Sequence, residues 1–570
     1  GQKVYYEVRD TDFVLGVLLK QAWTRDNIIE YNKNYDRVKP RFILGYLTAH
    51  LKVNRFTFSF WEGDQIDAPT IQRAYRRLNE TFYLKNLTFR PDSPMQEKVA
   101  KQVAARGIAT ITNDQIYKEA PYQAFNRGSA VGTLRVIKPD AKLDTMMFDR
   151  NDIVLLQESY PDIAPVSGIL TTVFSTPLSH VNLRATAWGI PNAGYTRARD
   201  EYGKLDGQKV YYEVRDTDFV LRPATEAEIR ELDHKINEQR TVKVPAADLG
   251  NARMAMLPRI HARDVVAYGT KCSNLGEIVS AHVGVNVPDG FGLPIFYYQR
   301  HMLLNGLDKK VNDMLADPRW ASDAAWRKAA LEDLQKQIKD APIDPAVLDA
   351  VYKRVRLKLG GKGVFVRSST NAEDLEGFNG AGLYDTVPNV RGKKQIGEAI
   401  KTVWASLWNW RAVQERAAFG IDHHAVYAGV LIQIGVNASA SGVLITDNLW
   451  NPEDDNSYTI NAKKGLGMRV VEGKNVPEQV IFDTSNDGTK IISRSDDPVM
   501  LVFDDKGGIR EVPNDNRGVI LTEERAKRLA EQVQRFVPLF SRKSALDVEW
   551  VLQGEEVWIV QARPYVAGKK

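Results

Sequence analysis

The sequence predicts a multidomain protein of the α/β (α+β) class, and three observations on its 570 residues carry this prediction. Hydrophobic residues make up 43% and charged residues 26% of the chain, as in ordinary globular proteins. Residues 129–221 hold short β-rich runs around one helical stretch, and residues 257–570 alternate strand-like with helix-like segments. A chain of this length is expected to form about three or four domains.

The first fifteen residues, GQKVYYEVRDTDFVL, recur identically at 207–221. The second copy reads as two short strands that close a domain. Two copies without a third do not indicate a solenoid. We therefore interpret 1–15 as an assembly artefact, with a genuine duplication as the alternative, and expect its strand pair to be poorly stable without a sheet.

Residues 16–128 predict an accessory region of mixed α/β structure. Phe56–Trp61 alternates like a strand, and the segment from Ala68 has Pro69 in its first turn and then an amphipathic helical pattern. Because no residue pattern here indicates chemistry, we expect an accessory or docking domain.

The next two segments predict a β-rich domain followed by a connection. The runs GTLRVI, DIVLLQES and SGILTTVFS predict strands within 129–221, and a helix is expected over His180–Trp188. Residues 222–256 are charged and then rich in proline and alanine, which predicts a connecting helix and a linker. The remainder, 257–570, is the predicted α/β unit.

Charge and cysteine content limit the partners. The 77 basic and 72 acidic residues nearly balance, and no long basic stripe occurs, so nucleic acid is not an expected partner. No apolar run approaches the roughly 18 residues that cross a bilayer, so no membrane contact is expected. The single cysteine, Cys272, excludes an intramolecular disulfide and a multi-cysteine zinc site. Without a recognisable signal peptide, we expect a cytoplasmic protein.

His180 lies at the predicted start of a helix, three residues after Pro177. It can be a structural histidine, a metal ligand or a nucleophile, and the lack of His or Cys at ligand spacing disfavours the metal. At a helix start, free N–H groups and the positive dipole end lower the imidazole pKa and stabilise a phosphoryl group. Ser179 is placed to cap the helix, and Arg184 lies one turn further on the same face.

This segment resembles the phosphohistidine swivelling domain of phosphoenolpyruvate synthase, pyruvate phosphate dikinase and glucan water dikinase. The family pattern has a glycine pair where this chain has Ser175–Thr176, and Thr where it has Leu178. The resemblance implies that His180 is the catalytic carrier of a phosphoryl group. The matching residues are Ser179, His180, Arg184, Gly189, Ile190 and Pro191.

Val364–Val390 predicts a phosphate-binding segment. A buried strand is expected to end in Arg367. Glu373 and Asp374 follow it, and a glycine-rich loop spans Gly377–Gly382. A strand-end arginine below flexible N–H donors suits a polyphosphate, although a solvated loop between two strands is the plainer alternative. The segment resembles the ATP-grasp-like nucleotide-binding domain of the same dikinases.

Two further segments follow the family's order. GTKCSNLGEI supplies Lys271, and DVEWVLQGEEVWIVQARP predicts two strands whose alternate residues share one face. Alone, these would be a surface lysine and a charged edge hairpin. The resemblance assigns ATP binding to Lys271, Arg367, Gly380, Gly382, Asp547, Glu549, Gln561 and Arg563, catalysis to His180, Arg367 and Lys271, and Mg²⁺ ligation to Glu549 and Gln561. Val430–Asn448 resembles the strands that hold adenine, whereas Met468 stands where the family often has Glu.

The resemblance implies two half-reactions. Mg²⁺–ATP phosphorylates His180 with release of AMP and phosphate, and the histidine domain then swings on a hinge at 222–256 to an acceptor. The order of the domains is that of glucan water dikinase, which makes a glucan the first acceptor to consider. The chain ends soon after the QARP segment, so we expect no pyruvate-binding barrel.

Two other functions stay open, together with the assembly state. One is a relative of phosphoenolpyruvate synthase that acts on a pyruvate-like small molecule or a partner protein, and the other is a non-catalytic ATP-binding regulator. A homodimer is kept as an assembly to test. Trp404 and Trp408 lie four apart on one helical face, which suits core packing more than stacking on a sugar.

Overall fold

The computed structural model describes most of the chain, and every structural statement below concerns the described residues. His180, Ser179, Arg184, Gly377 and Met468 lie outside them. The described residues are 3–8, 13–14, 43–50, 55–60, 66–83, 87–92, 94–112, 122–138, 141, 146, 148–157, 163, 166–172, 185, 189–237, 242–375, 378–380, 382–449, 454–467, 477–493, 495, 497–514, 518–540 and 544–565.

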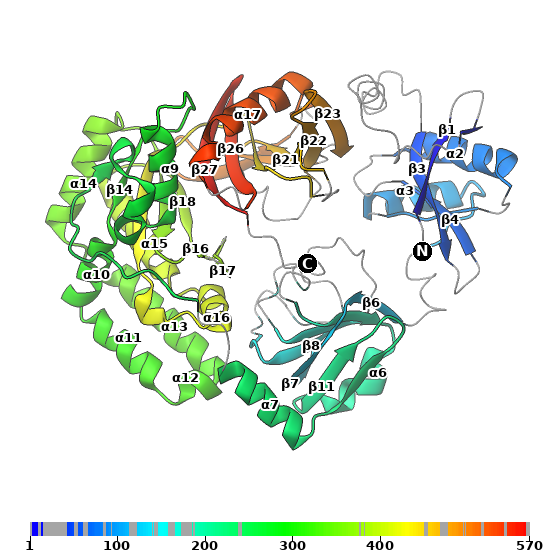
Figure 1. Ribbon diagram of the computed structural model, residues 1–570, viewed down its shortest axis with the longest axis horizontal. Coiled ribbons are helices and arrows are strands. Elements are labelled where there is room, and N and C mark those ends of the chain that lie inside the picture. Colours follow the sequence, from blue (N-terminus) through cyan, green and yellow to red (C-terminus); the bar gives the residue numbers. More distant parts are fainter. Residues whose placement is uncertain are drawn as a thin grey trace.

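In its described residues, the N-terminal unit is a five-stranded sheet with two helices (Figure 1). The strand order is β2 (Phe13–Val14), β1 (Lys3–Val8), β3 (Ile43–His50), β4 (Arg55–Ser59) and β5 (Thr88–Phe89), with helices α2 (Ala68–Thr81) and α3 (Pro94–Ala104). The predicted strand and the predicted proline-initiated helix are thus confirmed. The Asp67 side chain accepts a hydrogen bond from Thr70 N at 2.9 Å and caps α2. Phe58, Phe60 and Phe89 are fully buried in the core of this unit.

The first copy of the repeated segment does not stand alone. Strand β1 pairs antiparallel with β3 along its whole length, from Lys3↔Thr48 to Val8↔Ile43. The strand pair of the first copy is therefore part of a sheet, and the interpretation of 1–15 as an artefact stays a prediction. KVYYEV is a good strand former, and the edge of β3 offers the backbone hydrogen bonds that such a strand needs.

The β-rich unit is a seven-stranded sheet. Its order is β12 (Phe219–Pro223), β11 (Lys209–Val214), β7 (Gly128–Val136), β8 (Asp152–Leu156), β9 (Gly168–Thr171), β10 (Asn192–Tyr195) and β6 (Tyr122–Asn126). The three predicted strands correspond to β7, β8 and β9, and the second repeat copy forms the antiparallel pair β11–β12. Strands β7 to β10 run parallel, so the segment containing His180 leaves the carboxyl end of β9 and returns as its parallel neighbour β10.

Helix α7 (Glu226–Asn237) follows this unit, which confirms the predicted connecting helix. In Figure 1 it extends from the β-rich unit toward α12 (Arg319–Ser322). Residues 242–254 then lead into the C-terminal unit without regular structure.

The C-terminal unit contains two larger sheets. One has the order β13 (Ala255–Met256), β14 (Gly290–Leu293), β19 (Ala428–Ile434), β15 (Val364–Thr370) and β18 (Thr386–Val390). The other has the order β23 (Gly488–Ser493), β22 (Glu478–Asp483), β21 (Ser457–Lys464), β20 (Ala440–Ile445), β26 (Leu546–Gln553) and β27 (Glu556–Pro564). Two-stranded pairs are β16 (Asp374–Leu375) with β17 (Phe378–Asn379), and β24 (Val499–Phe503) with β25 (Ile509–Pro513).

Helices cover both sheets and give each its own core. The helices are α8 (Val265–Tyr268), α9 (Thr270–Ser280), α10 (Ile295–Leu304), α11 (Leu307–Ala316), α12, α13 (Ala324–Asp340), α14 (Pro345–Lys358), α15 (Lys393–Ser406), α16 (Trp410–Ala418) and α17 (Glu523–Phe536). Trp404 and Trp408 are 1% and 2% exposed and lie in the core under the first sheet, so their assignment to core packing is confirmed. None of the described helices combines the length and apolar composition required to span a bilayer.

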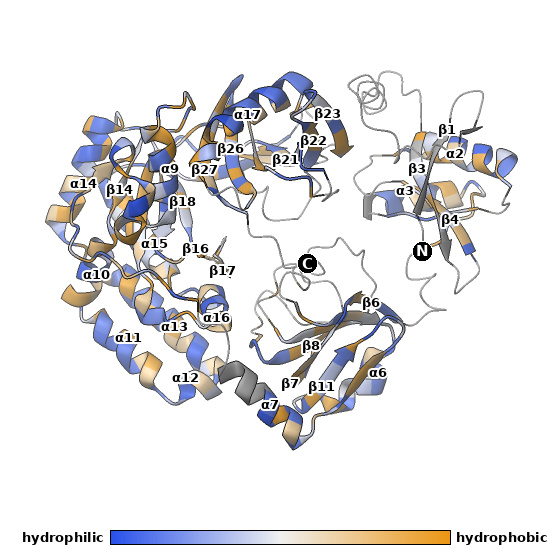
Figure 2. Cartoon of the chain, viewed as in Figure 1, coloured by the Kyte–Doolittle hydropathy of each residue, from blue (hydrophilic) through white to orange (hydrophobic). Residues whose placement is uncertain are grey.

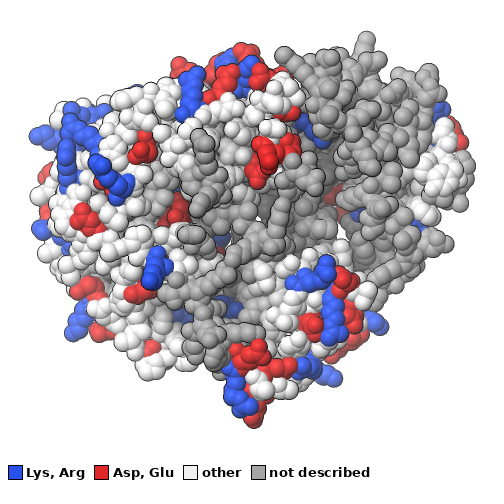
Figure 3. Space-filling view, in the orientation of Figure 1, with Lys and Arg blue, Asp and Glu red and all other residues white. Residues whose placement is uncertain are grey.

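Surface and core separate as the amphipathic patterns predict. Helix α17 buries Ala526, Leu529, Val533 and Phe536, and its outer side is hydrophilic in Figure 2. On the described part of the face in Figure 3, basic and acidic side chains are interspersed. The nearly balanced charge of the chain is thus also mixed locally on this face.

Candidate active site

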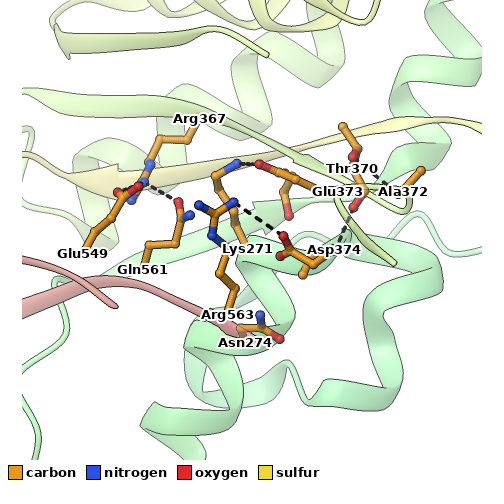
Figure 4. Close-up of polar contacts among 12 residues, drawn as sticks. Lys271, Asn274, Arg367, Thr370, Ala372, Glu373, Asp374, Glu549, Gln561 and Arg563 are labelled. Carbon is orange, nitrogen blue, oxygen red and sulfur yellow. Dashed lines mark hydrogen bonds and ion pairs between the residues drawn. The ribbon is translucent and has the colours of Figure 1, made fainter. Parts of the chain in front are cut away.

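Three distant segments meet between the two C-terminal sheets. They are the first turn of α9, the end of β15 with the turn after it, and the hairpin of β26 and β27 (Figure 4). The predicted residues that this junction brings together are Lys271, Arg367, Gly380, Asp547, Glu549, Gln561 and Arg563.

A glycine allows α9 to start against β15. Gly269 has φ +77°, and a Cβ on it would lie 1.9 Å from Ser369 O. The Cys272 N–H donates to Ser369 Oγ at 3.0 Å, and Asn274 Nδ2 donates to Ala562 O at 2.8 Å. Helix α9 is therefore attached to both β15 and β27, which places Lys271 between the two sheets.

Arg367 links its own strand to the hairpin. Its Nη1 donates to Val560 O at 2.6 Å, and its Nη2 donates to Glu549 Oε2 at 3.1 Å and to Gln561 Oε1 at 2.9 Å. Glu549 and Gln561 are direct cross-strand neighbours in the β26–β27 register. The Arg367 side chain is 9% exposed, whereas that of Glu549 is 33% exposed and open to solvent.

Arg563 forms a second buried charge cluster. Its Nη2 and Nε lie 2.6 and 3.0 Å from Asp547 Oδ2, and its Nη1 lies 3.6 Å from Asp374 Oδ1. Burial raises the pKa of Asp547 and of Asp374, and the Arg563 guanidinium opposes this rise for both carboxyl groups. The cluster therefore holds closely packed charges away from water.

Lys271 contacts the carboxylate of Glu373, and both side chains are buried. Burial, and then the nearby Arg367 guanidinium, lowers the pKa of Lys271 to about 7, while the carboxylates of Asp374 and Glu549 raise it. The Glu373 carboxylate also favours the charged form of Lys271, because it lies directly against the ammonium group.

Sequence reasoning noticed Glu373 and Asp374 but gave them no role. The available signal was their position directly after a buried strand that contains Arg367. Only the structure shows that Glu373 faces Lys271 and that Asp374 faces Arg563, because these contacts join segments about a hundred residues or more apart.

The glycine loop lies against Glu373. The Gly380 N–H donates to Glu373 O at 2.7 Å, and a Cβ on Gly380 would lie 2.8 Å from that same oxygen. Gly382 has φ +67°, and the space where its Cβ would be is open. The loop's backbone is thus held close to the buried lysine–glutamate pair.

The arrangement suits a polyphosphate more than a metal alone. Among the described residues no group of three or more His, Cys, Asp or Glu side chains is placed to hold a metal ion. Glu549 and Gln561 offer two neighbouring oxygen donors, and Mg²⁺ typically takes one or two protein carboxylates and completes its shell with phosphate oxygens and water. These donors therefore fit a magnesium ion that arrives with a nucleotide.

The β-rich unit touches the C-terminal unit through a separate contact. Asp149 Oδ2 lies 2.6 Å from Arg327 Nη2 on α13, and Arg150 Nη1 donates to Ala417 O on α16 at 2.7 Å. None of these four residues belongs to the charge cluster around Lys271. The predicted carrier His180 lies outside the described residues, so its distance from Lys271 is not defined.

Comparisons with known proteins match the part of the chain that contains this site. The model of the family described as pyruvate phosphate dikinase, AMP/ATP-binding domain, matches residues 265–570. A probable phosphoenolpyruvate synthase of Staphylothermus marinus is 31% identical over 344 residues, which cover 54% of this chain and 40% of the relative. The phosphoenolpyruvate synthase of Neisseria meningitidis serogroup B is 30% identical over 324 residues, covering 53% and 40%.

A rifampicin phosphotransferase of Streptomyces is 31% identical over 311 residues, covering 54% of this chain and 35% of the relative. The chain thus spans less than half the length of these three relatives. A solved D-alanyl-alanine synthetase A from Vibrio cholerae, with 13% identity, a TM-score of 0.18 and coverage of 39% of this chain and 47% of its own, is too distant to bear on the fold.

The matched region includes α9, β15 and the β26–β27 hairpin, so it contains every residue of the charge cluster. Because the family model covers more than half of the chain, this protein belongs to the pyruvate phosphate dikinase AMP/ATP-binding domain family.

Proposed function

We propose that this chain is an ATP-dependent phosphotransferase of the dikinase type, which loads His180 from ATP and passes the phosphoryl group to an acceptor. The observation that carries the proposal is the convergence of Lys271, Arg367 and Arg563, all buried, with the Glu549–Gln561 pair, of which Glu549 is partly exposed. Three cations at the junction of two sheets, beside a glycine loop, are the groups that a bound triphosphate requires.

In this proposal the chain's own residues bind and orient ATP in an ATP-grasp-like C-terminal domain. Lys271 and Arg367 hold phosphate oxygens, and the Arg367 contacts with Val560 O and Gln561 fix the direction of its guanidinium. The backbone N–H groups near Gly380 and Gly382 cover the phosphates. Glu549 and Gln561 would hold Mg²⁺, which offsets phosphate charge during transfer.

His180 is proposed to receive the β-phosphoryl group with AMP as the leaving group, while water accepts the γ-phosphoryl group and releases it as phosphate. The segment that contains it follows the carboxyl end of β9, and loops at the carboxyl ends of parallel strands are common functional positions. To reach both ATP and the acceptor, His180 requires movement of the unit 129–221. Residues 222–256, which include α7, are the proposed hinge.

The acceptor is proposed as a small molecule of the pyruvate class, because relatives over the same region include phosphoenolpyruvate synthases. The rifampicin phosphotransferase indicates that one nucleotide domain of this kind serves more than one acceptor chemistry. A glucan remains the second candidate, since the order of the histidine and nucleotide segments along the chain is the observation that favours it.

The decisive experiment is incubation with Mg²⁺ and ATP labelled at the β-phosphate. We expect an acid-labile, base-stable label on the protein together with AMP, lost in His180→Ala and kept in His424→Ala, whose side chain is exposed. ATP binding without label or AMP would instead support a non-catalytic regulator. The labelled protein is then offered pyruvate and α-glucan separately, and the compound that takes the label identifies the acceptor class.

A further inference from the structure

Each cation in the charge cluster around Lys271 is paired with a carboxylate of the same cluster. Lys271, Arg367 and Arg563 each contact at least one carboxylate, namely Glu373, Glu549, and Asp547 with Asp374. Four carboxylates thus face three cations. An incoming triphosphate is strongly anionic, so at least one of these ion pairs must open before phosphate oxygens reach the cation.

The four carboxylates differ in how firmly they are held. Asp547 accepts two hydrogen bonds from Arg563, and Glu549 is partly exposed, so water solvates it. Glu373 is 3% exposed and contacts Lys271 through Oε1, while its Oε2 is buried without a hydrogen-bond partner among the described residues. A buried carboxylate oxygen without a partner is costly, so this side chain gains most by leaving.

The three cations also differ in how many partners each would keep after losing a carboxylate. Arg367 keeps Val560 O and Gln561 as partners if it loses a carboxylate, and Arg563 has two carboxylates. For Lys271 the structure gives one ion-pair partner, Glu373. Exchange of Glu373 for a phosphate oxygen leaves Lys271 paired throughout, with no uncompensated buried ammonium.

Glu373 is also connected to the loop that is expected to cover the phosphates. Its carbonyl accepts the Gly380 N–H at 2.7 Å, and Gly380 packs directly on its backbone. Movement of the Glu373 side chain therefore occurs at the point where the glycine loop joins the cluster.

From these contacts we propose that Glu373 is an internal counter-ion that occupies Lys271 in the nucleotide-free protein and is displaced by the ATP phosphates. Glu373 is thus a positioning residue that acts through Lys271: it holds the ammonium group in place, and it competes with ATP for that group. The inference rests on the proposed ATP site and adds a residue that sets nucleotide affinity.

The test is ATP binding at equilibrium, in EDTA and again with Mg²⁺, for the wild-type chain and Glu373→Gln. Removal of an internal competitor raises the fraction of free Lys271, so we expect Glu373→Gln to bind ATP about tenfold more tightly under both conditions. The gain should vanish in the Lys271→Met background, because Glu373 acts only through that lysine. In turnover, KM for ATP should fall by about the same factor.

Glu398→Gln is the matched control, since Glu398 pairs with the buried Lys401 on α15, away from the cluster, and its ATP affinity should not change. If Glu373→Gln is too unstable to assay, Glu373→Asp withdraws the carboxylate from Lys271 and should tighten binding by less. Unchanged or weaker binding by a folded Glu373 variant overturns the inference alone. A wild-type chain that binds no ATP in either buffer overturns the proposed function together with it.

Discussion

Asp149 Oδ2 and Arg327 Nη2 lie 2.6 Å apart and join the β-rich unit to helix α13. Arg150 adds a hydrogen bond to Ala417 O. These contacts lie outside the Lys271 cluster and hold the β-rich unit against the C-terminal unit. If the proposed transfer of a phosphoryl group by His180 takes place, this docked position has to open. We expect the double variant Asp149→Asn/Arg150→Ala to increase the undocked population roughly tenfold.

Small-angle scattering measures this change as a larger radius of gyration, and proteolysis within 222–256 should accelerate. Asp216→Asn is the control, because Asp216 pairs with Arg127 inside the same unit and both side chains are exposed. An unchanged radius in the double variant would show that other contacts hold the two units together.

Glu549→Gln should leave the fold intact and strongly slow phosphorylation of the chain. Arg367 keeps its bonds to Val560 O and Gln561, and Glu549 is one-third exposed, so little stability is lost. Loss of a positioned charge at the phosphates is expected to slow transfer by about 10²–10³-fold. Label incorporation from β-labelled ATP measures the rate, and wild-type turnover in the variant would refute the role given to Glu549.

Gly380→Ala should weaken ATP binding through a steric effect. The new Cβ would lie 2.8 Å from Glu373 O, which forces the backbone apart and is expected to cost about 1–3 kcal/mol of stability. Gly360→Ala is the comparison: Gly360 has φ +64° and open space around it, so alanine there costs about 1–2 kcal/mol without touching the site. Calorimetric titration with ATP should separate the two variants; equal affinities would contradict the assignment of the loop.

The thiol of Cys272 should be unreactive in the native protein. Burial raises the pKa of Cys272 to about 12, so the thiolate that reacts with disulfide reagents is scarce at pH 8. We expect labelling about 10³-fold slower than for an exposed thiol, and rapid labelling after unfolding. Since Cys272 is the single cysteine, the unfolded chain should release one equivalent of the reagent's thiol leaving group. Immediate labelling of the folded chain would mean that α9 does not pack against β15.

Asp152 should make the stability of the β-rich unit depend on pH. Burial raises the pKa of Asp152 to about 6 from its usual 3.8, and the Asp149 N–H and Arg135 oppose this rise. The folded state thus binds the proton more tightly than the unfolded state. Its contribution is fully favourable below pH 3.8 and is lost as the pH rises through about 6.

We therefore expect Asp152→Asn to be more stable than wild type at pH 7.5, by up to about 3 kcal/mol, and nearly equal to it at pH 4. Urea unfolding of both chains at the two pH values gives the difference directly. Equal differences at both pH values would indicate that Asp152 is ionised in the fold without penalty.

Local patterns were sufficient for much of the secondary structure. The helix at Ala68–Thr81 follows from a capping aspartate, an early proline and apolar residues at helical spacing, all of which act within a few residues. Burial of Trp404 follows from its place on the apolar face of α15. The repeated hexapeptide KVYYEV forms a strand in both copies because its propensity is local.

Local patterns did not predict which strands pair with each other. Strands β1 and β11 have the same sequence, but β1 pairs with β3 in one sheet, whereas β11 pairs with β7 and β12 in another. This is possible because backbone hydrogen bonds form equally well with any exposed strand edge. The sequence by itself supplied the residues that we propose to bind phosphate, namely Lys271, Arg367 and the hairpin residues. Tertiary structure alone decided that Glu373 neutralises Lys271, since that contact depends on how α9 packs across β15, where burial makes an unpaired charge too costly to leave.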